Sequence, residues 1–194
     1  MRSKVFGIGF HKTGTTSLKA ALEILGYRVT GPNFVDDENV AESVLSKSLA
    51  IAPEFNAFQD NPWPILYREM DQAFPGSKFI LTIRDEAEWY ASALRQFGAR
   101  TTPMRRFIYG AGSPLGNEAS YRARYGSHNE SVLQYFAARP GDLLLMDITR
   151  GDGWDLLCPF LGCATPSHPF PYKNAGKDKR LLARIGRLLS RRAG

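Results

Sequence analysis

Cysteine is scarce in this chain, and Cys158 and Cys163 are the only two among 194 residues. One close pair cannot form the several bridges of a disulfide framework, and without companion ligands it cannot form a zinc site. The sequence therefore favours two buried free thiols in a reducing compartment, and we expect a cytoplasmic protein.

Long apolar runs are also missing. No uninterrupted apolar segment is long enough to span a bilayer. The N-terminal run is short and is broken by Gly7 and Gly9, so it lacks the apolar core of a secretory signal peptide. We therefore expect neither an integral membrane segment nor a leader sequence.

An excess of one charge is missing from most of the chain. The net charge is +6, but the segment 177–194 holds seven Lys and Arg against Asp178, so the preceding residues balance at zero. This distribution argues against a nucleic-acid-binding face on the domain. The apolar residues of 177–194 recur at helical spacing, which predicts a basic amphipathic C-terminal helix. We expect it to dock on the core, with contact to a membrane surface or an acidic partner as the alternative.

What remains is an ordinary soluble composition, with 43% apolar and 23% charged residues. A chain of 194 residues can bury most of its apolar surface in one core. We see no repeats and no linker, and expect a single domain over residues 1–194.

Apolar runs and helical periods alternate along the chain. Strands are expected from Lys4 and over 27–30, 55–59, 78–83 and 142–147, and helices over 15–25, 38–51, 62–74, 86–97, 118–138 and 154–161. This alternation predicts an α/β fold of three layers, α/β/α, around a mainly parallel sheet. The segment 98–117 lacks a clean period and is expected to be an irregular loop or partly helical lid that contacts the acceptor.

The most informative stretch is the start, where an apolar strand from Lys4 runs into a Gly/Thr loop that opens a helix. Such a junction directs backbone N–H groups and the positive end of a helix dipole at one point, which suits a phosphate or sulfate. Counted from Gly9, the second glycine of a Walker loop falls correctly at Gly14, but Thr15 follows where that loop has lysine. The lysine of this loop is Lys12, so it is not an ordinary ATP-hydrolysing loop.

A second group of polar residues follows the strand over 78–83. Arg84 can contact a phosphate through two N–H groups, and Ser92, eight residues later on the next helix, can reach the same anion. The alternative is a structural ion pair between Arg84 and Asp85 or Glu88.

Together these motifs resemble the sulfotransferases that use 3′-phosphoadenosine 5′-phosphosulfate (PAPS) and release 3′-phosphoadenosine 5′-phosphate (PAP). Lys12-Thr13-Gly14-Thr15-Thr16 matches their K-x-G-T-T loop, and Arg84 with Ser92 matches their 3′-phosphate pair. The sequences from Phe74 to Ser92 and from Gly151 to Gly162 are similar to those of the compact branch of the family. The resemblance implies a P-loop NTPase-like sulfotransferase fold.

The resemblance also implies roles for the matched residues. The backbone from Thr13 to Ser17, the hydroxyls of Thr15 and Thr16, and His11 are expected to bind the 5′-phosphosulfate, with Lys12 stabilising the leaving group. Lys173, in Tyr172-Lys173-Asn174-Ala175-Gly176, is the nearest counterpart of the family's late R-K-G element. Because a sulfuryl group carries less charge than a terminal phosphoryl group, we expect no metal.

A base must accept the proton of the acceptor hydroxyl or amine. Asp60 is the first choice, because a loop carboxylate beside an aromatic residue can have a raised pKa, although it can equally cap the helix from Pro62. His128 is the second choice for its intrinsic pKa. Phe107, Tyr109 and Tyr121 are expected to line a site for a sugar, an aromatic, a lipid or a peptide.

Two other classes of function compete with this interpretation. A small-molecule kinase with a deviant loop would need an aspartate on magnesium, for which Asp147 is available at the end of the strand over 142–147. A non-catalytic nucleotide-binding module would keep the loop and need no base.

Overall fold

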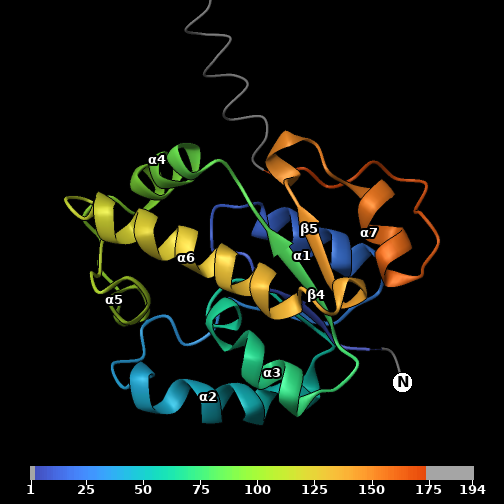
Figure 1. The fold of residues 1–194 in the computed structure, drawn as a ribbon, viewed down its shortest axis with the longest axis horizontal. Helices are drawn as coiled ribbons and strands as arrows, with labels where there is room; N and C mark the ends of the chain where they lie inside the picture. The colour runs from blue at the N-terminus through green and yellow to red at the C-terminus, as the bar shows by residue number, and fades with distance from the viewer. Residues whose placement is uncertain (1–2, 174–194) are drawn as a thin grey trace, which may run out of the picture.

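The computed structural model describes residues 3–173 and shows one parallel sheet between two layers of helices (Figure 1). Within this part of the chain the strands are β1 (Val5–Gly7), β2 (Val29–Thr30), β3 (Ala57–Phe58), β4 (Lys78–Thr82) and β5 (Leu143–Met146). Their order is β2-β3-β1-β4-β5, and each recorded pairing is parallel. This arrangement confirms the predicted α/β class and the mainly parallel sheet.

Helices connect the strands in the predicted alternation. They are α1 (Thr15–Ile24), α2 (Val40–Ile51), α3 (Tyr67–Ala73), α4 (Glu86–Phe97), α5 (Pro103–Tyr109), α6 (Glu118–Phe136) and α7 (Trp154–Leu161). Within residues 3–173, four 3₁₀ turns lie between them: η1 (Ala52–Glu54), η2 (Trp63–Leu66), η3 (Pro140–Asp142) and η4 (Ile148–Arg150).

Alternate residues of each central strand face opposite layers, because side chains alternate along a strand. On β4, Phe79 and Leu81 join the larger core beneath α2, α3 and α6, whereas Ile80 joins the smaller core beneath α1 and α7. The strands are therefore buried on both faces, which is why they lack a polar period in the sequence.

The segment 98–117 is partly helical, one of the two forms expected for it. It contains α5, which begins behind a Thr102 side chain that accepts a hydrogen bond from the Arg105 N–H and ends at Gly110 in the left-handed conformation. One expectation needs correction, because the expected helix over 62–74 is divided into η2 and α3.

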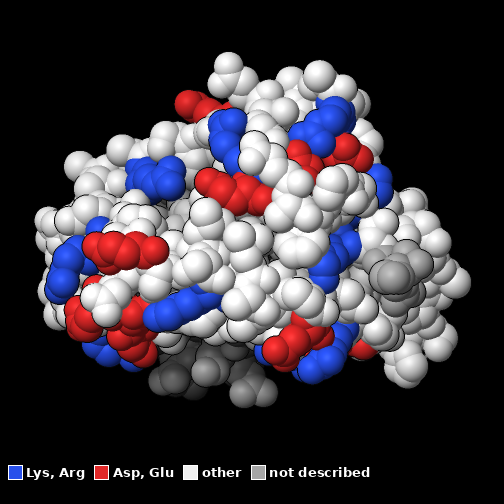
Figure 2. Space-filling view, turned by 90° about the horizontal axis from the view of Figure 1, so that it is seen from below, with Lys and Arg blue, Asp and Glu red and all other residues white. Residues whose placement is uncertain are grey.

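The C-terminal helix expected over 177–194 lies outside the described residues. On the face shown in Figure 2, Lys and Arg side chains are interspersed with Asp and Glu. The residues before 177 have no net charge, and on this face their positive and negative side chains are mixed rather than separated by sign.

Gly9 follows β1 where the chain passes close to β4. A Cβ atom at Gly9 would collide with the backbone of Thr82, including its nitrogen at 2.8 Å. Gly9→Ala is expected to lower the free energy of unfolding by about 3 kcal/mol, since neither backbone can shift freely. Urea denaturation measures this loss. Gly141→Ala is the control, because no atom lies within 4 Å of its added Cβ; a loss of similar size there would contradict the steric explanation.

Candidate functional site

The loop between β1 and α1 has the geometry of an anion-binding site. Gly14 precedes α1 at a φ of 101°, and a Cβ there would lie 2.9 Å from the Ile148 Cβ, so glycine is required. In the described part of the chain, no hydrogen bond uses the N–H groups of residues 13–16. The Ser17 N–H was also expected to bind the phosphosulfate, but it donates to the Gly14 carbonyl at 2.9 Å. These free N–H groups at a helix N-terminus can receive an anion.

The side chain of Thr13 fixes the loop instead of facing a ligand. It is fully buried, and its hydroxyl donates to the Phe10 carbonyl at 2.6 Å. Because a hydroxyl carries one proton, the 2.6 Å contact between the Thr13 and Thr82 hydroxyls is donated by Thr82. The loop is thereby tied to β4, while Thr16 stays exposed on the first turn of α1.

Asp60 lies beside this loop at the end of β3. The Thr15 hydroxyl donates to Asp60 Oδ2 at 3.1 Å, and the Asn61 N–H donates to Oδ1 at 2.7 Å. Its side chain caps no helix, since η2 has no side-chain cap and the Trp63 N–H donates to the Asp60 backbone carbonyl. Burial raises the pKa of Asp60, opposed by both hydrogen bonds and by the charge of Lys12. A carboxylate with a raised pKa is a stronger base.

His128 lies on α6 behind the loop. Its ring stacks on Phe10 with centroids 4.3 Å apart, and its Nε2 lies 2.8 Å from the Ile8 carbonyl. A carbonyl only accepts, so Nε2 carries the proton of the neutral ring. Burial lowers the pKa of His128 to about 4. This geometry makes His128 a support of the loop backbone and leaves Asp60 as the carboxylate that contacts the loop.

The imidazole of His11 also lies in the core. It packs edge-on against Phe97 and Tyr109, and its Nε2 is 3.4 Å from the Tyr109 hydroxyl. Burial lowers the pKa of His11 to about 3, helped by the charges of Arg105 and Lys12. The ring is therefore buried and neutral at physiological pH, and we do not assign it a contact with the phosphosulfate of the donor.

The lowered pKa values of His11 and His128 predict that the folded protein loses stability in acid. Each has a folded pKa below its unfolded value of 6.5, so their contribution is complete above pH 6.5 and is lost as the pH falls toward 4 and 3. Between pH 8 and pH 5 each is expected to lower the free energy of unfolding by about 2 kcal/mol. Urea denaturation at the two pH values measures this difference.

His128→Gln should reduce the pH-dependent loss by about half, whatever it does to stability at pH 8. His168→Gln is the matched control, because His168, the remaining histidine of the chain, is exposed. An unchanged difference between pH 8 and pH 5 in His128→Gln would show that the ring is not the titrating group.

Arg84 and Ser92, predicted as a second anion site, lie after β4 and on α4. Arg84 follows β4 at the same sheet edge as the loop, and the Tyr125 hydroxyl holds its backbone by accepting from its N–H and donating to its carbonyl. Its Nε lies 3.3 Å from Glu88, whose side chain is 58% exposed. Such an exposed pair contributes little stability and can exchange for a ligand anion. Ser92 lies one turn beyond Glu88 on α4.

The Arg84–Asp85 ion pair offered as an alternative does not form. The Asp85 carboxylate instead caps α4 by accepting from the Glu88 N–H at 3.0 Å. The ion pair of Arg84 is therefore with Glu88, the other residue that the sequence offered.

Lys173 lies near α1 although it is 156 residues away from it in the sequence. Its backbone N–H donates to the Ser17 hydroxyl at 2.9 Å. The preceding residues are anchored by Phe170, which packs on Trp154 at 4.9 Å, and by the Tyr172 hydroxyl, which donates to the Gly151 carbonyl. The structure thus brings Lys173 to the first turn of α1, while residues 174–176 lie outside the described part of the chain.

The expected aromatic lining of an acceptor site needs correction. Tyr109 and Tyr121 are buried and stack on each other with centroids 4.0 Å apart, so they belong to the core. Phe107 is 45% exposed and does not belong to the core. Sequence reasoning also missed the Thr82 hydroxyl and the Tyr125 clamp, because both partners are distant in the chain and neither belongs to a motif.

Over residues 3–173, no helix is long and apolar enough to cross a membrane, and no three His, Cys, Asp or Glu side chains gather as metal ligands. Asp147, the candidate magnesium ligand of the kinase alternative, caps η4 by accepting from the N–H groups of Thr149 and Arg150.

Comparison with known proteins identifies the family. No curated protein matches the chain. The family model described as sulfotransferase domain matches residues 4–115 and 101–179, which include the loop, Asp60, Arg84 and Lys173. Because this match covers most of the sequence and the fold agrees with it, the chain belongs to the sulfotransferase family.

Proposed function

We propose that this sulfotransferase moves a sulfuryl group from PAPS to a hydroxyl or amine of its acceptor. One observation carries the proposal: the loop that holds Lys12 and the unused N–H groups of residues 13–16 is hydrogen-bonded, through Thr15, to the half-buried carboxylate of Asp60. A site for an anionic donor and a base for the acceptor therefore share one sheet edge.

The donor's two charged ends match the two anion sites. The N–H groups of residues 13–16 and the dipole of α1 suit the 5′-phosphosulfate. The guanidinium of Arg84 and the hydroxyl of Ser92 suit the 3′-phosphate, for which Glu88 would give up its exposed ion pair. Lys173 is proposed as a further contact, since its backbone is bound to α1.

In the transfer step the acceptor oxygen attacks the sulfur atom of PAPS. A new O–S bond forms, the S–O bond to the 5′-phosphate breaks, and its electron pair stays on the phosphate oxygen of the departing PAP. Lys12 stabilises the charge that grows on this oxygen, and Asp60 takes the proton from the acceptor. We propose that no metal takes part, because the sulfuryl group carries less charge than a terminal phosphoryl group.

A comparison of ligands tests this function. PAP at about 100 times its Kd is expected to stabilise the protein by about 2.7 kcal/mol, which raises Tm by about 5 to 10 °C. Mg-ATP should leave Tm unchanged, and a chelator should leave the rate of PAP formation from PAPS unchanged. Stabilisation by Mg-ATP but not PAP would favour the kinase, and PAP binding without sulfated product across hydroxyl and amine acceptors would favour the binding module.

A further inference from the structure

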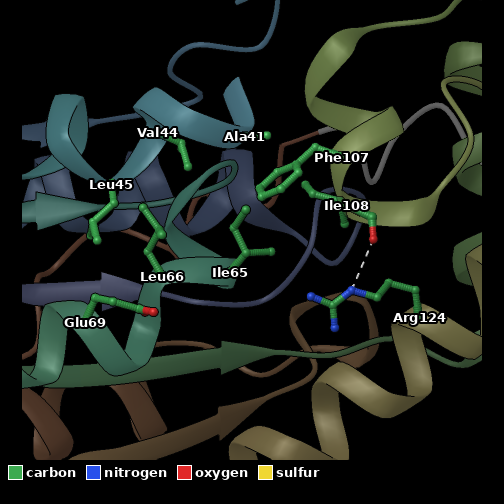
Figure 3. Close-up of a pocket in the computed structure, with 9 residues that line it drawn as sticks. All are labelled: Ala41, Val44, Leu45, Ile65, Leu66, Glu69, Phe107, Ile108 and Arg124. Carbon is green, nitrogen blue, oxygen red and sulfur yellow. Dashed lines mark hydrogen bonds between the residues drawn. The ribbon is translucent and has the colours of Figure 1, made fainter. Parts of the chain in front are cut away.

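A cavity of about 340 Å³ lies between α2, η2, α3, α5 and α6, on the larger-core side of the sheet (Figure 3). Most of its lining is apolar, contributed by Val44, Leu45, Ile65, Leu66, Phe107 and Ile108. Phe107 is 45% exposed and Leu45 is 38% exposed, so the cavity opens to solvent through apolar side chains. An open cavity of this size and lining is suited to the apolar body of a small molecule.

Two charged residues, Arg124 and Glu69, enter this cavity from opposite sides (Figure 3). Arg124 is held in place, because its Nε donates to the Ile108 carbonyl at 3.1 Å and its guanidinium lies 5.7 Å from the Phe10 ring centroid. Its guanidinium lies on the side of the cavity that Ile65 and Ile108 also line (Figure 3). Among the residues that the structure describes, no carboxylate forms an ion pair with Arg124.

A half-buried guanidinium fixed in an apolar cavity without a carboxylate partner is complementary to an anionic group of a ligand. Arg124 offers the two parallel donors that a carboxylate accepts. Glu69 is not held in the same way, since no recorded hydrogen bond or ion pair within residues 3–173 fixes its side chain. The fixed charge, that of Arg124, therefore decides the preferred charge of the ligand.

Segments that line the cavity adjoin residues of the candidate site. Ile65 lies on η2, which begins three residues after Asp60. Ile108 precedes Tyr109, whose hydroxyl faces His11, and the Phe10 ring that lies beside Arg124 belongs to the loop that carries Lys12. The cavity is thus built from the segments that position the proposed base and the proposed leaving-group cation.

We propose that this cavity binds the acceptor, and that the acceptor is an amphiphilic carboxylate: an apolar ring or chain that carries a hydroxyl at one end and a carboxylate that pairs with Arg124. This assignment rests on the proposed sulfotransfer and adds to it the class of acceptor. It also gives α5, which supplies Phe107 and Ile108, a role in acceptor choice.

Two matched probes test the assignment: 4-(4-hydroxyphenyl)butanoate and its primary amide, which differ in charge but not in size. Binding of each is measured by calorimetry in the presence of saturating PAP. The carboxylate is expected to bind about tenfold more tightly than the amide, a difference of about 1.4 kcal/mol. Arg124→Gln should abolish this preference, Arg124→Lys should retain part of it, and Glu69→Gln should leave it in place.

Ala41→Trp provides an independent test, because Ala41 lines the cavity from an exposed position on α2 and a tryptophan there fills the cavity without entering the core. It should weaken both probes by about tenfold or more. Equal binding of the two probes, no binding of either, a preference that survives Arg124→Gln, or an affinity unchanged by Ala41→Trp would overturn the assignment.

Calorimetry with PAP alone separates this inference from the proposed function. None of the four variants should change the affinity for PAP by more than about twofold, because Ala41, Glu69 and Arg124 are not among the residues proposed to bind the donor. Failure of the wild-type protein to bind PAP would overturn the proposed function. Normal PAP binding with no preference between the probes would overturn the acceptor assignment alone.

Discussion

Lys12→Gln is expected to lower kcat/KM for sulfuryl transfer by about 100- to 1,000-fold. Lys12 carries the positive charge of the loop at a φ of 70°, a conformation that fixes its backbone beside the free N–H groups of residues 13–16. A charge held in place before the reaction stabilises the growing negative charge on the departing phosphate more than mobile solvent does. The rate is measured as PAP formed from PAPS with hydroxylated acceptors.

The Lys12→Gln variant should also bind PAP about tenfold more weakly, since the product carries the full charge of the leaving group. Lys19→Gln is the control, because Lys19 is a half-exposed lysine on the same helix that opens from the loop. It should change neither quantity by more than about twofold. Equal losses in both variants would indicate a general effect of positive charge near α1 rather than a role for Lys12 in the transfer.

The sequence predicts elements best where local signals and burial agree. The bounds of α4 agree with the predicted helix over 86–97, and local signals explain them: Asp85 supplies a capping carboxylate and Gly98 ends the helix. The strand β4 was recognised because it is buried on both faces and is therefore continuously apolar. The order of the five strands could not be predicted, since it depends on pairings between segments that are tens of residues apart.

The helix α5 shows why the bounds of a short element escape prediction. Its signals are present, with Thr102 and Pro103 at the start and Gly110 at the end. Its seven residues span only about two turns, too few to display a helical apolar period against a background of Gly, Pro and Arg. The sequence therefore placed the expected acceptor contacts in the segment 98–117 without locating the wall of the cavity that α5 forms.

In the candidate site, the motifs predicted which backbone segments come together. They did not predict whether each side chain is buried in the core or faces a ligand. The spacing of the loop motif predicted both the position of Gly14 and the start of the helix at Thr15. The burial of His11 and His128 was not predicted, because an imidazole in a loop or helix has the same sequence signature whether it faces a ligand or supports the core. Asp60 differs, since its contact with Thr15 links residues 45 positions apart and only the fold creates it.

Asp60→Asn is expected to lower kcat by about 100- to 10,000-fold, the range for loss of a general base. Asparagine keeps the size of the side chain and tolerates the left-handed backbone at this position, where φ is 61°. It can still accept from the Asn61 N–H, so the fold should persist. Affinity for PAP should change by less than about tenfold, because the donor phosphates are assigned to other residues. Full activity of Asp60→Asn would remove Asp60 from the mechanism.

The pH profile distinguishes a base from a merely structural carboxylate. Burial raises the pKa of Asp60, so the carboxylate becomes protonated at a higher pH than an exposed aspartate does. The kcat/KM of the wild-type protein is therefore expected to fall about tenfold for each unit of pH below this raised pKa, because only the ionised form accepts a proton. Asp60→Asn should lose this acidic limb, whereas Asp36→Asn, at an exposed aspartate, should retain it together with full activity. An acidic limb that persists unchanged in Asp60→Asn would assign the titration to another group.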